Sequence, residues 1–177
     1  MAVIVGHGSR NQYKDVNKAK ADLEDRLGDV DLIVWGGDEP DSPDSPESPG
    51  VGQLVKLIAS ENENVCVCAV ARKGWADWLS PQSPQNSWVT HVLTYEADSW
   101  GGVSTGGEAV GGTAFYCDKA CVTGKLFAVG GGEIAKQEVA YCRREGWHVE
   151  YVRAECASGG GYGEVDGLFD SRPSLTT

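Results

Sequence analysis

The sequence lacks long apolar runs and an excess of basic residues. No stretch approaches the roughly 20 apolar residues of a membrane-spanning helix, and the first apolar run, residues 2–5, is too short for a secretory signal. Lysine and arginine number 15 against 26 acidic residues, so the formal net charge is -11. Such a surface repels phosphate backbones and anionic lipids. We therefore expect a cytoplasmic protein that binds neither nucleic acid nor membrane, although local backbone dipoles still allow a small anionic ligand.

Cysteine pairs typical of metal ribbons are also missing. The chain has six cysteines, and no two are separated by two residues, so neither a zinc ribbon nor a thioredoxin motif is indicated. We expect most of them to be small core residues. Cys117 and Cys121 are spaced by one helical turn, which leaves a metal or oxidation site as a less favoured alternative. No metal ion and no cofactor is expected.

The order of the apolar segments indicates an α/β protein. Near-continuous runs of valine, isoleucine and leucine are typical of parallel strands that are covered on both faces. Strands are predicted at 2–5, 30–37, 64–71, 89–97, 125–129 and 148–155. Helical periodicity predicts helices at 12–27, 51–60, 113–122 and 133–145. This alternation predicts a three-layer Rossmann-like fold with a mostly parallel central sheet.

A chain of 177 residues suits one domain with a full core. We assign residues 1–157 to a single Rossmann-like domain and residues 158–177 to a glycine-rich, polar tail, which we expect to be loosely ordered. The acidic, proline-rich stretch 38–50 and the glycine-rich stretch 98–112 are expected as loops. They could close over a ligand or could be tolerated surface insertions.

Glycines follow three of the predicted strands. They are Gly6 and Gly8, Gly36 and Gly37, and Gly130, Gly131 and Gly132. Glycine allows a sharp turn and close approach of a ligand to the backbone, and the start of the next helix favours phosphate. In a parallel sheet these strand ends share the edge where ligands bind. The pattern predicts a phosphate-binding edge, with a plain tight turn as the alternative for any single cluster. None of the clusters matches G-x-G-x-x-G.

The segment "GGGEIAKQE", residues 130–138, resembles the P-G-G-x-G-T-x-x-E signature of the Lonely Guy proteins. These belong to the SLOG superfamily of Rossmannoid nucleotide binders, whose other loop motifs are similar to "GSR" at 8–10 and "IVWGG" at 33–37. The resemblance implies that the turn from Gly131 to Ala135, Ile134 included, holds a nucleotide phosphate. It also implies a homodimer as an option.

The resemblance further implies that Glu138, at the acidic position, assists cleavage of an N-glycosidic bond. Gly130 replaces the proline of the signature, Ile134 the second glycine and Ala135 the threonine. An arginine–lysine pair of the family has only Asp118 and Lys119 as its counterpart. We therefore expect nucleotide binding first, and leave phosphoribohydrolase-type hydrolysis open.

Two side chains are candidate catalytic residues. Glu138 could stabilise an oxocarbenium-like centre or position water, or it could simply pair with a neighbouring cation. Arg10, next to Ser9, could hold phosphate or ribose through a bidentate fork. A surface cation at a helix start is the alternative for Arg10.

Two other functions remain open. "VGHGSR" also resembles the opening of sirohydrochlorin-type chelatases, in which His7 would ligate the incoming metal and His91 would be a second ligand. A nucleotide sensor without turnover is the third possibility. Trp75, Trp78 and Trp88 could stack on a base, form an oligomer interface or belong to the core.

Overall fold

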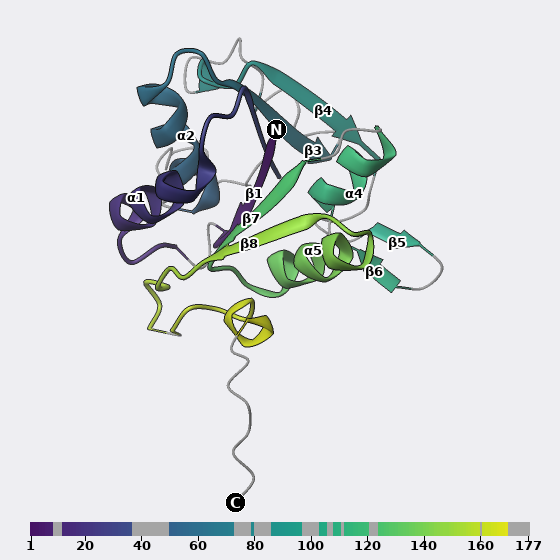
Figure 1. Ribbon diagram of the computed structural model, residues 1–177. Helices are drawn as coiled ribbons and strands as arrows, with labels where there is room; N and C mark the ends of the chain where they lie inside the picture. Colours follow the sequence, from purple (N-terminus) through teal and green to yellow (C-terminus); the bar gives the residue numbers. More distant parts are fainter. Residues whose placement is uncertain are drawn as a thin grey trace, which may run out of the picture.

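The protein is built on one parallel sheet (Figure 1). The computed structural model describes residues 1–8, 12–36, 50–72, 79, 86–96, 103–105, 108–110, 112–120, 124–159 and 161–169, without the side chains of 72, 103–105, 108–110 and 119. The six sheet strands are β1 (Ala2–Gly6), β2 (Leu32–Gly36), β3 (Cys66–Arg72), β4 (His91–Tyr95), β7 (Lys125–Val129) and β8 (His148–Val152). All six predicted strands are confirmed.

The strand order is β4-β3-β2-β1-β7-β8, and every neighbouring pair is parallel. The chain steps outward from β1 to β4, then returns to the other side of β1 with β7 and β8. The direction of the connections therefore reverses between β1 and β7, where Gly6 lies opposite Val129. Such a reversal opens a crevice at the carboxyl ends of the strands. The Rossmann-like α/β prediction is confirmed.

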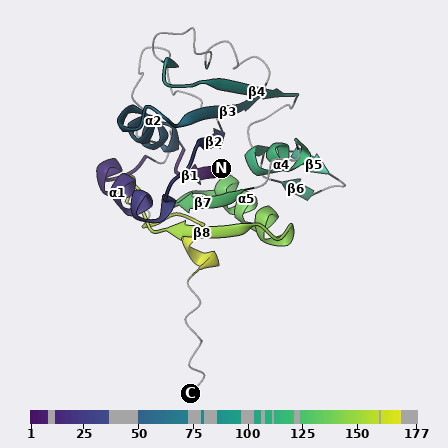
Figure 2. The same cartoon turned by 45° about the horizontal axis from the view of Figure 1, so that its top comes forward.

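Helices cover both faces of the sheet (Figure 2). Helices α1 (Val16–Leu27) and α2 (Val51–Glu61) pack on one face, and α4 (Gly112–Lys119) and α5 (Glu133–Arg144) on the other. The side chains of β1 alternate between the two cores, with Ile4 towards α1 and α2 and Val5 towards α4 and α5. This two-residue period places apolar side chains on both faces of one strand.

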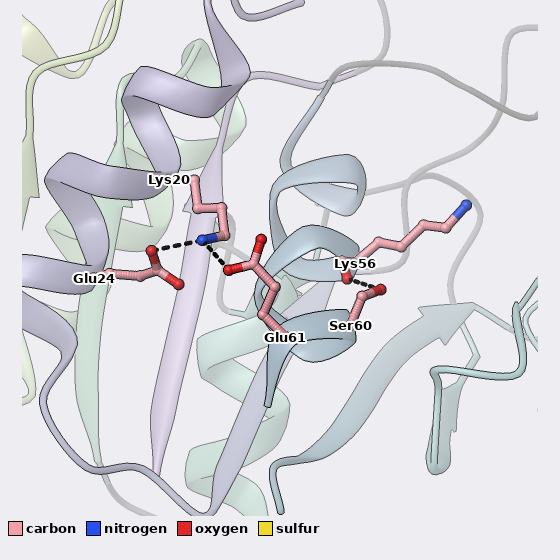
Figure 3. Close-up of polar contacts among 5 residues, drawn as sticks. All are labelled: Lys20, Glu24, Lys56, Ser60 and Glu61. Atoms are coloured by element: carbon pink, nitrogen blue, oxygen red, sulfur yellow. Dashed lines mark hydrogen bonds and ion pairs between the residues drawn. The ribbon is translucent and has the colours of Figure 1, made fainter. Parts of the chain in front are cut away.

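Lys20 connects α1 to α2 (Figure 3). Its Nζ atom lies 2.7 Å from a carboxylate oxygen of Glu24 and 2.8 Å from one of Glu61. Only 13% of the Lys20 side chain is exposed, so this cation is less screened by solvent than Lys18, the other lysine of α1, which is 67% exposed.

The first helix is shorter than predicted. It begins at Val16 rather than residue 12, because the Asp15 side chain accepts a hydrogen bond from the backbone N–H of Lys18 and caps the helix. Upstream of this cap, Tyr13 forms an antiparallel bridge with Cys156. Tyr13 therefore connects the first loop to the segment that follows β8.

The glycine-rich stretch 98–112 contains regular structure. Strands β5 (Val103–Thr105) and β6 (Glu108–Val110) form an antiparallel pair outside the main sheet. The proline-rich stretch lies outside the described residues apart from Gly50, and so do Trp75 and Trp78. Trp88 contacts the buried Trp35, with ring centroids 4.9 Å apart.

Residues 161–169, which the sequence pattern assigned to the tail, pack against the domain. A short 3-10 helix, η2 (Asp166–Leu168), follows the fully buried Val165. The Phe169 ring stacks on Tyr151 of β8 with centroids 4.7 Å apart. Residues 170–177 lie outside the described residues. Within the described part of the chain, no helix has the length and apolar character needed to cross a bilayer.

Candidate functional site

The predicted ligand residues gather at the carboxyl edge of the sheet. Gly6 ends β1, Gly36 ends β2, and Gly130 follows β7, so parallel pairing brings all three to the same edge. Gly8 is exposed, with open space where a side chain would stand. Ser9, Arg10 and Gly37 lie outside the described residues, and their predicted roles stay predictions.

The glycines after β7 form a turn that only glycine accommodates. Gly130 has a φ of 57° and Gly131 a φ of 122°. A Cβ on Gly130 would lie 2.3 Å from Nε2 of His7, and one on Gly131 would lie 2.6 Å from Cβ of Ala135. The Gly130 N–H already donates to the Val152 carbonyl at 2.9 Å. Gly130 therefore offers no unused amide to a phosphate, contrary to the expectation for this turn.

Protein groups also cover Gly131. The Val165 N–H donates to the Gly131 carbonyl at 3.2 Å, and a Cβ on Gly163 would lie 2.4 Å from that oxygen. The side of the turn that leads into α5 is more open. Gly132, which caps α5 without a side-chain hydrogen bond, is partly exposed, and Ile134 is 50% exposed, whereas Ala135 is buried.

His7 lies beneath this covering and is 1% exposed. Its Nε2 atom is 2.9 Å from the Ala154 carbonyl, which can only accept, so Nε2 carries the hydrogen. The ring meets Tyr13 edge-on with centroids 4.9 Å apart. Nδ1 is buried and has no hydrogen-bond partner among the described residues. Burial lowers the pKa of His7 below its usual value, against the opposing effect of the hydrogen bond to Ala154.

The structure does not bring His7 and His91 together. His7 follows the carboxyl end of β1, whereas His91 is the first residue of β4, so the two lie at opposite edges of a parallel sheet. His91 is exposed, and its Nδ1 atom lies 2.9 Å from the Thr90 hydroxyl. Over the described ranges, no three His, Cys, Asp or Glu side chains are placed to hold a metal ion. His91 is therefore not the second ligand that the chelatase hypothesis needs.

Glu138 is a buried carboxyl group, only 2% exposed, on the face of α5 that packs beneath α4. Its Oε1 atom accepts a hydrogen bond of 2.6 Å from the Thr113 N–H at the start of α4. Its Oε2 atom is buried without a hydrogen-bond partner in the part of the chain that the structure describes. Burial raises the pKa of Glu138 to about 7, against the opposing effect of nearby Thr113 and Ala114 donors. The contact is thus a hydrogen bond to a helix start, not the ion pair considered as the alternative.

Thr113 connects Glu138 to the edge of the sheet. A Cβ on Gly36 would lie 2.5 Å from the Thr113 hydroxyl oxygen, so the threonine packs directly on the end of β2. Gly36, Thr113 and Glu138 therefore form one contiguous cluster from β2, α4 and α5. A carboxyl group with a pKa of about 7 exists in both protonation states near neutral pH, which suits general acid or general base chemistry.

The sequence pattern missed two features of this site. The helical pattern places Thr113 at the start of a helix but does not indicate that its backbone N–H contacts Glu138. The spacing of Gly130, Gly132 and Ala135 also fits G-x-G-x-x-A, the alanine-ending form of the dinucleotide fingerprint. The β7–α5–β8 unit places that spacing between a strand and a helix, as the fingerprint requires.

Comparison with known proteins leaves the family of this chain open. No protein-family model matches the chain, and no curated protein or solved structure shows significant similarity to it.

Proposed function

We propose that this protein binds a nucleotide or nucleotide-derived molecule at the carboxyl edge of its sheet, beside the reversal between β1 and β7. The observation that carries the proposal is the Glu138 carboxyl group, which is buried next to that edge with Oε2 unpartnered among the described residues. A buried polar atom without a partner costs stability. Carboxyl groups with strongly raised pKa values are characteristic of functional sites.

The glycine turn supports a phosphate-bearing ligand. The Gly130, Gly132 and Ala135 spacing lies in a strand–turn–helix unit, and α5 begins at the surface. Backbone N–H groups at such a helix start, together with the helix dipole, favour an anion. The buried half of the turn is closed, so the ligand would approach from the side of Gly132 and Ile134.

Glu138 supports hydrolysis at a ribose as the chemistry of this site. In its ionised form it can stabilise the positive charge that develops on the sugar when an N-glycosidic bond breaks, and in its protonated form it can donate to the leaving base. A sensor that binds the same ligand without turnover would use the same turn. The two differ only in whether free base is released.

The test combines binding and turnover. Adenosine monophosphate, ADP-ribose, adenosine and inorganic phosphate are added separately while the melting temperature is followed, and free adenine is measured after incubation. We expect the two phosphate-bearing nucleosides to raise the melting temperature. Glu138→Gln should abolish adenine release, whereas Glu145→Gln, at the exposed far end of α5, should not. If no nucleotide shifts the melting temperature at millimolar concentration, the proposal is wrong.

A further inference from the structure

We propose that residues 161–169 form a latch over the Gly130–Gly131 turn, and that binding of a proton to His7 releases this latch. The latch is a property of the chain itself and does not require a ligand. Only its consequence, that release gives a nucleotide access to the turn, rests on the proposed function.

Both halves of the latch contact the domain, and its first residue, Gly161, also accepts a backbone hydrogen bond from Cys156 at 2.8 Å. Its first half lies on the turn, where Val165 donates to the Gly131 carbonyl at 3.2 Å and Gly163 packs against the same oxygen. Its second half is anchored to β8 and its extension through Asp166. One carboxylate oxygen of Asp166 accepts from the Tyr151 hydroxyl at 2.9 Å, and the other accepts from Arg153 at 3.1 Å. The contacts of Asp166 can therefore hold the second half of the latch in place while the first half separates from the turn.

The junction at which the latch begins has the composition of a hinge. Gly159 and Gly161 have φ values of 76° and 74°, and nothing lies within 4 Å of where a Cβ would stand on either. Packing does not require glycine at these positions, but the left-handed backbone does. Gly163 differs, because its missing side chain is what allows the latch to approach the turn.

His7 lies directly under the latch. A Cβ on Gly163 would lie 3.1 Å from Cε1 of His7. Neutral His7 uses Nε2–H towards Ala154 and leaves Nδ1 without a partner among the described residues. Protonation adds a second N–H and a positive charge to this buried position, which is costly without an acceptor. Lifting the latch lets water reach Nδ1, so the protonated state favours the open form.

The neighbours of His7 offer little to stabilise the cation. The ring faces Tyr13, the Ala154 carbonyl and the glycine backbones of Gly130 and Gly163. The charged groups on the surrounding segments are paired with one another: Lys14 with Glu155, Lys136 with Glu164, and Arg153 with Asp166. Because the pKa of His7 is lowered in the closed form, the latch is closed above pH 6.5 and loosens as the pH falls below it.

Hydrogen exchange read by mass spectrometry tests the latch. Protection factors, corrected for the intrinsic pH dependence of exchange, are compared at pH 7.5 and 5.5 for peptides that cover 126–136 and 158–169. For an open-state histidine pKa near 6.5, protection should fall at pH 5.5 by a factor that can reach about ten. In His7→Gln, whose neutral amide can still donate to Ala154, protection should be equal at both pH values. Equal protection in the wild type, or a fall that persists in His7→Gln, would overturn the proposal.

A pair of glycine variants tests the same latch without a substitution at His7, so this test does not depend on whether His7→Gln folds. Gly163→Ala should lose protection in both peptides at both pH values, because its Cβ collides with the Gly131 carbonyl. Gly146→Ala is the matched control, since Gly146 has a φ of 77° against 84° for Gly163 and nothing lies within 4 Å of its Cβ position. Wild-type protection in Gly163→Ala would contradict the latch. Addition of adenosine monophosphate to the open Gly163→Ala variant tests nucleotide access separately, so a failure to bind does not alter the exchange result.

Discussion

The backbone N–H of Thr113 donates to Oε1 of Glu138 at 2.6 Å, and this bond joins the start of α4 to the middle of α5. The Glu138 carboxyl group thereby accepts a hydrogen bond from the first turn of α4. Its second oxygen, Oε2, is buried and has no partner among the described residues. One side chain thus combines a structural contact with an unmet hydrogen-bonding capacity at the edge of the sheet.

This burial should make stability depend on pH through Glu138. The folded-state pKa is raised from 4.5 to about 7, so the folded protein holds the proton more tightly than the unfolded chain. The contribution of the Glu138 proton to the free energy of unfolding is fully present below pH 4.5. It decreases by roughly 3 kcal/mol as the pH rises to 7. Urea denaturation of the wild type and Glu138→Gln between pH 5 and 8 measures the difference. Parallel pH profiles for the two proteins would contradict the prediction. The latch responds in the opposite direction, because His7 favours the closed form at high pH.

Gly36 and Thr113 should be energetically coupled. In Gly36→Ala the new Cβ would lie 2.5 Å from the Thr113 hydroxyl oxygen but 3.9 Å from its Cβ. We expect Gly36→Ala to cost about 1–3 kcal/mol in the wild type. In a Thr113→Ala background, which removes the colliding oxygen, the cost should fall by at least about 1 kcal/mol. Chemical denaturation of the four proteins in the cycle measures the coupling, and strict additivity would refute the contact.

Lys20 should contribute more than its neighbour on the same helix. Lys20 is 13% exposed in its side chain and contacts two carboxylates from two helices, so Lys20→Ala should cost about 1–2 kcal/mol. Lys18, 67% exposed in its side chain and paired with Asp22, is the control and should give no measurable loss. The cost at Lys20 should shrink in high salt. Equal losses for the two variants in denaturant titrations would be inconsistent with the bridge between α1 and α2.

The cysteines should differ in reactivity. Cys66 is exposed, whereas Cys117 and Cys142 are buried, and burial raises the pKa of Cys117 to about 12 and that of Cys142 further. Because the thiolate is the reactive form, iodoacetamide at pH 8 should label Cys66 in the native protein and the other two only after unfolding. Peptide mapping reads the sites. Labelling of Cys142 at the rate of Cys66 without denaturant would show that the α5 core opens readily.

The strand positions could be predicted because each buried strand is a short, nearly continuous apolar run, and the alternation with helical periodicity left few arrangements of the sheet. The strand order, which the sequence pattern did not predict, places "FAVGGG" beside the first strand. The glycine pattern alone could not show what fills the space above the turn. The close neighbours of Gly130 are His7 and Ala154, and Gly131 has Val165 nearby; all three are distant from the turn in sequence.

The contacts of the candidate residues could not be predicted from the sequence either. Glu138 has the spacing of a solvent-facing helix acid as readily as that of an inward one, and only the packing of α4 across it buries it. Local composition suggested a loose tail after residue 157, because glycine and polar residues dominate there. That average hides three apolar residues, Val165, Leu168 and Phe169, which pack against the core.

The central place of β1 has a consequence for folding during synthesis. Residues 1–36 can pair β1 with β2 early, but the other edge of β1 stays unpaired until residues 125–129 arrive. An apolar strand with an open edge is a template for pairing with another chain. We infer that the nascent protein is prone to pair with other chains until β7 is synthesised and pairs with β1.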